Sequence, residues 1–498
     1  MTLSLIGYAF VPLGILLFIS RNRLHLLYAT ILTSPLVAST IIELGGSTTG
    51  LQPSYFFGAL LIMRTLPTLA YRGYDFTGIQ RKILLAWSGF ASFSALTLTF
   101  PIFHLIDGTS DIFNSAYDSG EYLSYPYHAL TQFIYLIYFL LLTLAVATCV
   151  RTPEVLKKSV KFFIAGVFFS LAWGLFVQLP SYFLGFDYPY WLFNNHPGYA
   201  QGFDQKIFIA GIPLLRISST TPEPSMFAYI LSTTIALLVF FRMEKRKIFE
   251  SKLTGGVLIT CIFFTMIITT STTAIVGLLL VFLSSFFSFG SKLGWGKELL
   301  RKFPLFLFLF SFVGLIMWTE GGLYWEAVKF QAIDKIGDSS SSVGERFSFF
   351  THGLGILAST YGLGAGYGVN STADLLSTLL SNVGFIGFFL FLLCNYYTLA
   401  PIFFGRVSRT SHGSNRATLT VSLAGAYTIA LLVAFLAIPG FIFTFPWLLL
   451  GLIIAQYRFL NLNPTLRSSH PIPLTLTSVR RLGQSELPPK FRLPRDGV

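Results

Sequence analysis

Two arginines in separate polar segments are the residues best suited to bind an anion. Arg216 lies in RISSTTPEPSMFAYIL, just before a long apolar run, and Arg346 lies in SSSSVGERFSFFTHGLG. A guanidinium group can hold a phosphate through paired hydrogen bonds, which a lysine cannot reproduce. If the fold brings both segments together, they predict a diphosphate site. Ser225 and the free N–H groups at the start of the apolar helix would add partial positive charge.

Carboxylates and histidines near these arginines could accept a proton. Glu223 follows Arg216, Glu345 and His352 flank Arg346, and His196 lies upstream of Arg216. An Arg216–Glu223 ion pair that only caps a helix is the alternative to a reactive carboxylate, and the sequence favours neither. A lone histidine is more often a surface residue than a catalyst. No group of His, Cys, Asp and Glu has the spacing of metal ligands, so we expect no metal.

Glycines recur at every second position from 362 to 368, in YGLGAGYGVNSTAD. Alternating glycines let the backbone approach a ligand closely, which makes Gly364, Gly366 and Tyr367 candidate contacts to a ligand. The favoured alternative is a tight loop that closes a helix hairpin. The spacing is not that of a dinucleotide fingerprint. Ser371 followed by Asp374 resembles a capping box at the start of the next helix.

Membrane helices are the elements that must position these residues. Of the 498 residues, 53% are apolar and only 11% are charged, whereas soluble domains carry about 25% charged residues. This composition argues against a disordered protein, a disulfide scaffold, a coiled coil or a nucleic-acid-binding module, although the net charge is +13. It predicts an all-α, polytopic transmembrane helical bundle.

Apolar runs long enough to cross a bilayer, about 20 residues each, predict about 13 spans. They lie near 3–19, 24–43, 52–70, 83–100, 129–149, 160–183, 224–241, 253–269, 271–289, 304–318, 378–399, 418–437 and 440–457. We therefore expect one transmembrane domain over 1–457. The basic, proline-rich tail over 458–498 is expected to be a disordered cytoplasmic extension.

The distribution of charge predicts the orientation of these spans, because cytoplasmic loops retain Lys and Arg. Of the 34 Lys and Arg residues, 28 fall in 20–24, 71–82, 150–161, 242–252, 290–302, 400–416 and 458–498, and 13 of the 21 acidic residues fall in the other connections. This predicts a multi-pass membrane protein with an exported N-terminus and a cytoplasmic C-terminus. The positive charge also suits membrane lipid with anionic head groups, so no nucleic-acid partner is expected.

Three of the connections predicted to be exported are long, namely 101–128, 184–223 and 319–377. Loops of this length in a compact bundle are usually functional or disordered. Short amphipathic helices are expected near Tyr324 to Ile336. The first two loops are rich in aromatic residues, including Trp191, which could stack on sugar rings. An interfacial aromatic belt is the favoured interpretation of these residues.

From about residue 210 to 400, the chain resembles the O-antigen ligase and polymerase superfamily of bacterial inner-membrane glycosyltransferases. The matching pieces, in order, are the Arg, Glu, Pro and Ser of 216–225, a double span broken at TTSTTA (269–274), Arg346, the glycine run 362–368, and NVGFIGFFLFLL at 382–393. The order and spacing of these pieces carry the resemblance, which covers less than half of the chain.

The resemblance implies a GT-C-like bundle with a large periplasmic loop of short helices. It implies action, without metal or cofactor, on glycan carried by undecaprenyl diphosphate, with Arg216 and Arg346 holding the donor diphosphate. The ligase branch is similar but usually has a histidine just after the glycine run, and GVNSTADLLSTLLSNVG contains none. The polymerase branch is therefore favoured, with a chain-length regulator as a further partner.

The expected reaction is attack of an acceptor hydroxyl on the donor anomeric carbon. Glu223 is the first candidate for the general base, followed by Glu345 and His352. The nearest alternative is an O-antigen ligase that transfers glycan to lipid A core or to a protein. Another alternative is a transporter or flippase of lipid-linked sugars, but Arg64 is the one clear charge within a span and the two halves show no convincing repeat. Both features favour an enzyme.

Overall fold

The computed structural model describes residues 2–43, 50–72, 76–100, 127–197, 202–209, 212–243, 249, 251–290, 342–403, 420–438 and 442–459. The expected span at 304–318, the expected helices near Tyr324 to Ile336, most of loop 101–128 and the tail from 460 lie outside these residues.

Helices form nearly all of the regular structure. They are α1 (Leu5–Ile19), α2 (Leu24–Thr33), α3 (Pro53–Arg72), α4 (Gly78–Thr97), α6 (Tyr127–Cys149), α7 (Pro153–Trp173), α8 (Leu179–Leu184), α9 (Tyr190–Phe193), α10 (Pro224–Met243), α11 (Lys252–Ile268), α12 (Thr272–Gly290), α16 (Ser342–Ser359), α17 (Leu375–Phe403), α18 (Thr420–Ala437) and α19 (Thr444–Gln456). A π-helical turn, Gly174–Gln178, joins α7 to α8, and a short 3-10 turn covers Gly202–Asp204.

Four helical segments are long and apolar enough to cross a membrane, namely Ala129–Cys149, Pro153–Leu184, Pro224–Met243 and Leu375–Phe403. Shorter apolar helices, which include α1, α2, α11, α12, α18 and α19, accompany them. The all-α, multi-pass membrane architecture expected from the composition is therefore present in the described part of the chain.

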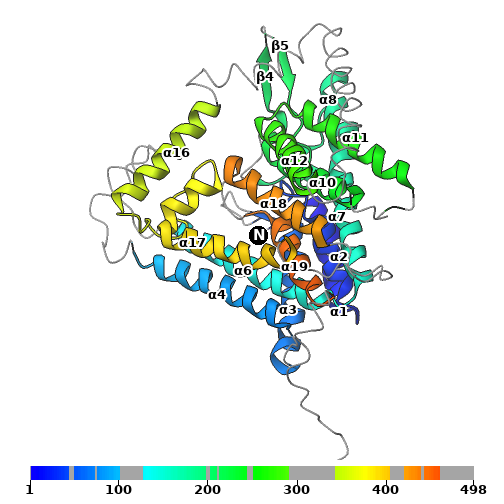
Figure 1. Cartoon of the computed structure of the whole chain (residues 1–498). Helices are drawn as coiled ribbons and strands as arrows, with labels where there is room; N and C mark the ends of the chain where they lie inside the picture. Colours follow the sequence, from blue (N-terminus) through cyan, green and yellow to red (C-terminus); the bar gives the residue numbers. More distant parts are fainter. Residues whose placement is uncertain are drawn as a thin grey trace, which may run out of the picture.

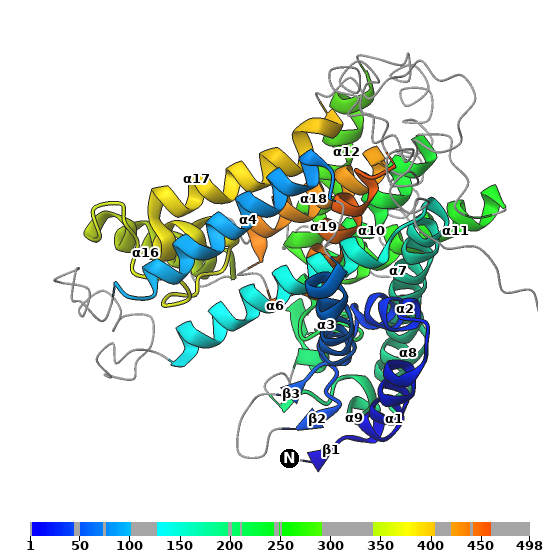
Figure 2. The same cartoon turned by 90° about the horizontal axis from the view of Figure 1, so that it is seen from below.

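Helix α10 lies at the centre of the bundle. Every residue of α10 except Val239 and Arg242 is buried, and the helix packs against α18 and α12. Helices α4, α6 and α17 run side by side, and α16 lies beside α17 (Figures 1 and 2). Aromatic side chains fill the contact between α6 and α19, where Phe139 stacks on Trp447 with ring centroids 5.6 Å apart.

Two small antiparallel sheets complete the fold. One pairs β1 (Thr2–Leu3), β2 (Ile42–Glu43) and β3 (Gly50–Leu51), and the other is the hairpin of β4 (Lys206–Ile209) and β5 (Ile212–Leu215). The hairpin projects beyond the helices at one edge of the molecule (Figure 1). It lies within the long connection 184–223, for which the sequence predicted no strands.

Three expected elements differ from the structure. The span expected over 24–43 is helical only to Thr33. The N–H groups of Ser34 and Leu36 donate to carbonyls three and not four residues earlier, and the chain then bends back to form β2. The span expected over 160–183 begins earlier, at Pro153, and the π-helical turn interrupts its series of α-helical hydrogen bonds. The span expected over 378–399 starts at Leu375 and is kinked at Gly384, whose φ is +63°.

The connection expected over 319–377 is also more regular than predicted in its described part. Residues Ser342–Ser359 form α16, and the glycine run connects α16 to α17. The two arginines of interest therefore lie on different kinds of structure. Arg346 is on the first turns of a helix, whereas Arg216 begins a loop between β5 and α10.

Candidate functional site

The loop of residues 216–223, called here the Arg216 loop, is held by buried hydrogen bonds. Gln178, in the π-helical turn, accepts hydrogen bonds from the backbone N–H groups of Ser218 and Ser219 at 3.2 and 2.7 Å. Its amide donates to the carbonyl of Phe203 at 2.7 Å and to the Ser218 hydroxyl at 3.2 Å. Residues 217–222 are all buried. Because buried N–H groups need partners, Gln178 fixes the path of the loop.

A second set of contacts ties the Arg216 loop to the bend after α2. The N–H of Ala38 donates to the Thr220 carbonyl at 2.9 Å, and the Thr220 hydroxyl donates to the Pro35 carbonyl at 3.0 Å. Asn194 donates its amide to the Ser219 carbonyl at 2.8 Å. The early end of α2 is thus part of the site, since it supplies backbone groups that a continuous helix would have used internally.

The structure brings Arg216 and Arg346 together although 129 residues separate them in the chain. Burial lowers the pKa of Arg216 to about 10, while nearby Glu223 raises it and Arg346 lowers it. Burial also lowers the pKa of Arg346, and Glu223 and then Asp374 raise it. Because these electrostatic effects decay with distance, the four charged groups form one cluster, the Arg216–Arg346 cluster.

Neither guanidinium group is saturated by described residues. Arg346 donates from Nη1 to the carbonyl of Ala437, the last residue of α18, at 2.8 Å. Arg216 has a buried Nε that finds no hydrogen-bond partner in the described part of the chain. A buried donor without a partner costs about 1–3 kcal/mol. An anionic ligand that reached this donor would remove that cost.

Glu223 lies close to both arginines, yet it closes no ion pair with either. Its carboxylate accepts a hydrogen bond from Ser225 at 2.9 Å, and its side chain is exposed. Lys206 and Asp204, by contrast, do form an ion pair, at 3.0 Å. The alternative of a local Arg216–Glu223 pair is therefore not formed. Ser225, a candidate contact residue, is buried and orients this carboxylate.

Asp374 belongs to the cluster and was not among the sequence candidates for the site. Its carboxylate accepts hydrogen bonds from the N–H and the hydroxyl of Ser377, at 2.8 and 2.6 Å, and so caps α17. The capping residue is thus Asp374 and not Ser371, which is exposed. A carboxylate that caps a helix start is ordinarily structural. Only the packing of α16 on α17 makes it a counter-charge for Arg346.

The glycine run uses its close approach to contact α17. The φ angles of the four glycines from 362 to 368 are +81°, +81°, +118° and +74°. Ala365 and Gly366 donate their N–H groups to the carbonyls of Ser381 and Asn382, both at 2.8 Å. A Cβ atom on Gly364 would lie 2.5 Å from the backbone nitrogen of Gly384. These contacts give Gly364 and Gly366 a structural role, and their contact with a glycan stays a prediction.

Two aromatic candidates differ in accessibility. Tyr367 is buried, donates its N–H to the Thr97 hydroxyl at 3.2 Å, and has its pKa raised by burial. Its ring is packed edge-on against Phe133. Trp191 is half exposed on α9, where it could meet a ligand. Of the two, only Trp191 presents a surface to solvent.

The remaining candidate bases are less well placed or fall outside the description. His352 is half-buried, burial lowers its pKa, and its Nε2 has no partner among the described residues. It lies six residues after Arg346, hence about 120° around α16 from it. His196 is buried, and its backbone N–H donates to the carbonyl of Ala38 at 3.1 Å. Burial lowers the pKa of its imidazole. The side chain of Glu345 lies outside the described residues.

In the described residues, no three side chains of His, Cys, Asp or Glu gather as metal ligands would. The site is instead a cluster of two cations and two carboxylates carried by three segments, which are the Arg216 loop, α16 and the start of α17, and the end of α18 adds the Ala437 carbonyl. No protein-family model matches the sequence, and no curated protein matches it.

Proposed function

We propose that this protein is an inner-membrane glycosyltransferase that takes glycan from a lipid-diphosphate donor and transfers it to a lipid-linked acceptor at the periplasmic face. The observation that carries the proposal is the meeting of Arg216 and Arg346, both unsaturated, from distant segments. A diphosphate presents several acceptor oxygens to two guanidinium groups. Undecaprenyl diphosphate is the carrier that the sequence resemblance implies.

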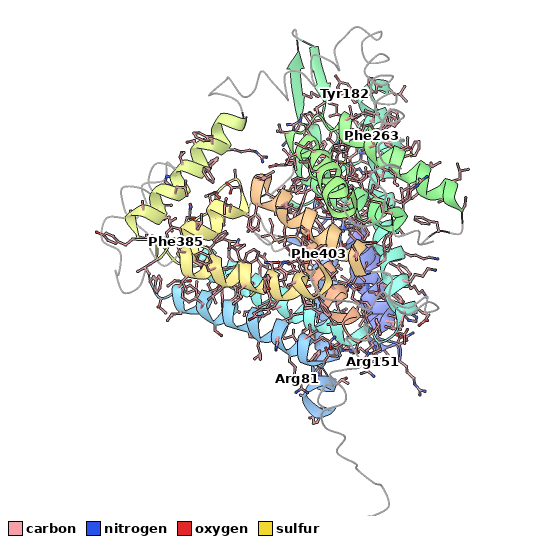
Figure 3. The ribbon with its side chains drawn as sticks, viewed as in Figure 1. Arg81, Arg151, Tyr182, Phe263, Phe385 and Phe403 are labelled. Carbon is pink, nitrogen blue, oxygen red and sulfur yellow. The ribbon has the colours of Figure 1, made fainter. Side chains whose placement is uncertain are left out.

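The proposal includes about 13 spans with a periplasmic N-terminus. This orientation is supported by the positions of labelled side chains in Figure 3, where Arg81 and Arg151 lie at one edge of the molecule and Tyr182 lies at the opposite edge. Both arginines belong to connections predicted to be cytoplasmic. Tyr182 donates its hydroxyl to the carbonyl of Pro213 in β5, next to the Arg216 loop. The cluster would then face the periplasm.

The chemistry assigned to the cluster follows from its charges. An acceptor hydroxyl attacks the anomeric carbon of the donor, the bond from that carbon to the diphosphate oxygen breaks, and the diphosphate leaves with the bonding electrons. Arg216 and Arg346 stabilise the negative charge that grows on the leaving group. Glu223 accepts the hydroxyl proton, since it is exposed and held by Ser225 and is not consumed by an ion pair.

Within this reaction class, we propose a polysaccharide polymerase that uses a lipid-linked repeat unit as acceptor. The reason remains the lack of a histidine between the glycine run and residue 386. An O-antigen ligase would share the same donor site and differ in its acceptor.

A transporter of lipid-linked sugars is the second candidate, because several structural features favour it. Helix α17 is kinked at Gly384, the π-helical turn interrupts the segment from Pro153 to Leu184, and α2 ends after ten residues. Broken helices that bind substrate within the membrane are typical of secondary transporters.

The test is transfer by the purified full chain with an undecaprenyl-diphosphate repeat unit as sole substrate, followed by gel analysis of the glycan. A polymerase gives a ladder of multiples. We expect Arg216→Ala and Arg346→Ala each to lower the rate about 100-fold or more, as loss of one transition-state donor does elsewhere. Lys206→Ala is the matched control, because Lys206 is a nearby cation that pairs with Asp204 on the hairpin.

Each other outcome assigns the protein to an alternative. Product that appears only after lipid A core or an acceptor protein is added would mean a ligase. Donor that is bound or moved across vesicles, without new glycosidic bonds, would mean a transporter. Equal activity of Arg216→Ala and Lys206→Ala would contradict the diphosphate role of the cluster.

A further inference from the structure

A cavity with two other arginines lies at the edge of the molecule opposite the Arg216 loop. It has a volume of about 430 Å³ and is lined by Arg23, Pro67, Thr68, Tyr71 and Arg151. These residues come from three connections that the charge distribution predicts to be cytoplasmic, namely 20–24, 71–82 and 150–161, and from the last turns of α3. Arg151 marks this edge in Figure 3. We call it the Arg23–Arg151 cavity.

The cationic side chains in and beside this cavity differ in their hydrogen bonds to the protein. Arg64, the charge within a predicted span, donates to the carbonyls of Leu17 and Phe18 at 3.2 and 2.6 Å and so caps α1. Arg23 makes no hydrogen bond from its side chain to a described residue, and the start of α2 is capped by Asn22, which accepts from the N–H of Leu24. No carboxylate lines the cavity among the described residues.

Two helix starts add positive potential to the same place. Helix α2 begins directly after Arg23, and α7 begins two residues after Arg151. The two helices pack on each other, so their N-terminal ends lie at the same edge of the bundle. The partial positive charge of both helix dipoles therefore adds to that of the two guanidinium groups. Thr68 and Tyr71 add two hydroxyl donors.

The surface beside the cavity is apolar along one stripe of α3. Met63, Pro67 and Tyr71 follow one another at intervals of four residues, so they share one face of the helix. Met63 is 59% exposed and Tyr71 is 90% exposed. This stripe runs from the cavity along the outer surface of the bundle toward the middle of α3. A ligand with a phosphate and an acyl chain could occupy both at once, which a soluble phosphate could not.

We propose that the Arg23–Arg151 cavity binds the phosphate of an anionic phospholipid from the cytoplasmic leaflet. Paired guanidinium groups and two hydroxyls hold the phosphate oxygens, and the acyl chain lies along the Met63 stripe of α3. This binding site is separate from the Arg216–Arg346 cluster and does not depend on the transfer reaction.

Lipid binding is measured on the purified full chain by native mass spectrometry. Phosphatidylglycerol is titrated against phosphatidylcholine, whose head group is zwitterionic, and against soluble glycerol phosphate. We expect one phosphatidylglycerol to be retained, with affinity about tenfold lower in the Arg23→Gln/Arg151→Gln variant. The matched control is Arg21→Gln/Arg81→Gln, which removes the same charge from exposed positions on the same side that do not line the cavity.

Three outcomes would overturn the proposal. Equal retention of both lipids would remove the anion selectivity, and equal weakening in the control variant would reduce the effect to diffuse surface charge. Equal binding of glycerol phosphate and phosphatidylglycerol would show that the acyl chain adds nothing, so the site would bind a soluble phosphate and not a lipid. If the double arginine variant does not fold, Thr68→Val/Tyr71→Phe keeps the charge and removes the hydroxyls. It should weaken phosphatidylglycerol binding about threefold, and unchanged binding would contradict the assigned phosphate contacts.

Discussion

The Arg216 loop and the glycine run both place irregular backbone beside the Arg216–Arg346 cluster. The two segments differ in the groups that accept hydrogen bonds from their backbone N–H groups. In the Arg216 loop, backbone N–H groups donate to a side chain, that of Gln178. In the glycine run, N–H groups donate directly to carbonyls of α17 next to the kink at Gly384. Both solutions meet the requirement that buried backbone groups have partners.

The difference explains which segment can carry charged groups. The Gln178 side chain reaches the Arg216 loop from the π-helical turn, so the loop backbone need not lie against another backbone. The loop residues therefore keep their side chains, and Arg216 and Glu223 can project from its ends. Backbone-to-backbone contact leaves no room for a Cβ atom at Gly364. The glycine run therefore contributes no charged side chain and serves to fix the start of α17, where Asp374 lies.

The largest effect is expected when a side chain is added to the glycine run. In Gly364→Ala, the new Cβ meets the Gly384 nitrogen and the left-handed φ becomes strained, which together should cost about 3 kcal/mol or more. Thermal unfolding in detergent measures the loss. Gly355→Ala, in α16 with nothing within 4 Å of its Cβ position, is the control and should be neutral or slightly stabilising. Equal stability of both variants would refute the backbone-contact account.

A smaller but still large effect is expected when the side-chain clamp of the Arg216 loop is removed. Gln178→Leu leaves the buried N–H groups of Ser218 and Ser219 without an acceptor, at a cost of about 2 kcal/mol. Gln456 is also buried, but its amide has no partner among the described residues, so Gln456→Leu should be neutral or stabilising. The comparison fails if the two variants melt at the same temperature.

Removal of the Asp374 charge should affect the cluster more than the fold. Asparagine retains a good helix cap, so Asp374→Asn should change stability by less than about 1 kcal/mol. It removes a charge that raises the pKa of Arg346, and we expect transfer to fall about tenfold. Asp187→Asn, at an exposed position, controls for loss of a carboxylate. An unchanged transfer rate would show that Asp374 is only a cap.

The smallest effect concerns pH and the bend that supports the Arg216 loop. Burial lowers the pKa of His196 below its ordinary value of 6.5, so the unfolded chain takes up a proton more readily than the folded one. Stability is then complete above about pH 6.5 and falls as the pH drops below that value. Melting temperatures at pH 7.5 and pH 5 should differ less in His196→Gln than in the wild type. His25→Gln, at an exposed position, should leave the difference unchanged.

The sequence predicted most helices because their cause is local. Runs such as those at 129–149 and 224–241 must satisfy their backbone within the segment when they cross an apolar phase, and α6 and α10 lie where these runs predicted them. The early end of α2 was not predicted. Apolar residues continue past Thr33, but the bend there is stabilised by Thr220, about 190 residues later in the chain.

The sequence by itself also nominated Arg216 and Arg346, because Lys and Arg are rare in the connections predicted to be exported, and Glu223, because it follows Arg216 closely in the chain. Only the tertiary structure decided that these groups meet, that Asp374 joins them, and that the glycine run contacts α17. The physical reason is that residue type determines what a group can bind, whereas the distance between groups on different helices is set by packing. Contacts such as that of Gly166 with the Leu32 carbonyl, where α7 meets α2, are not encoded in either segment alone.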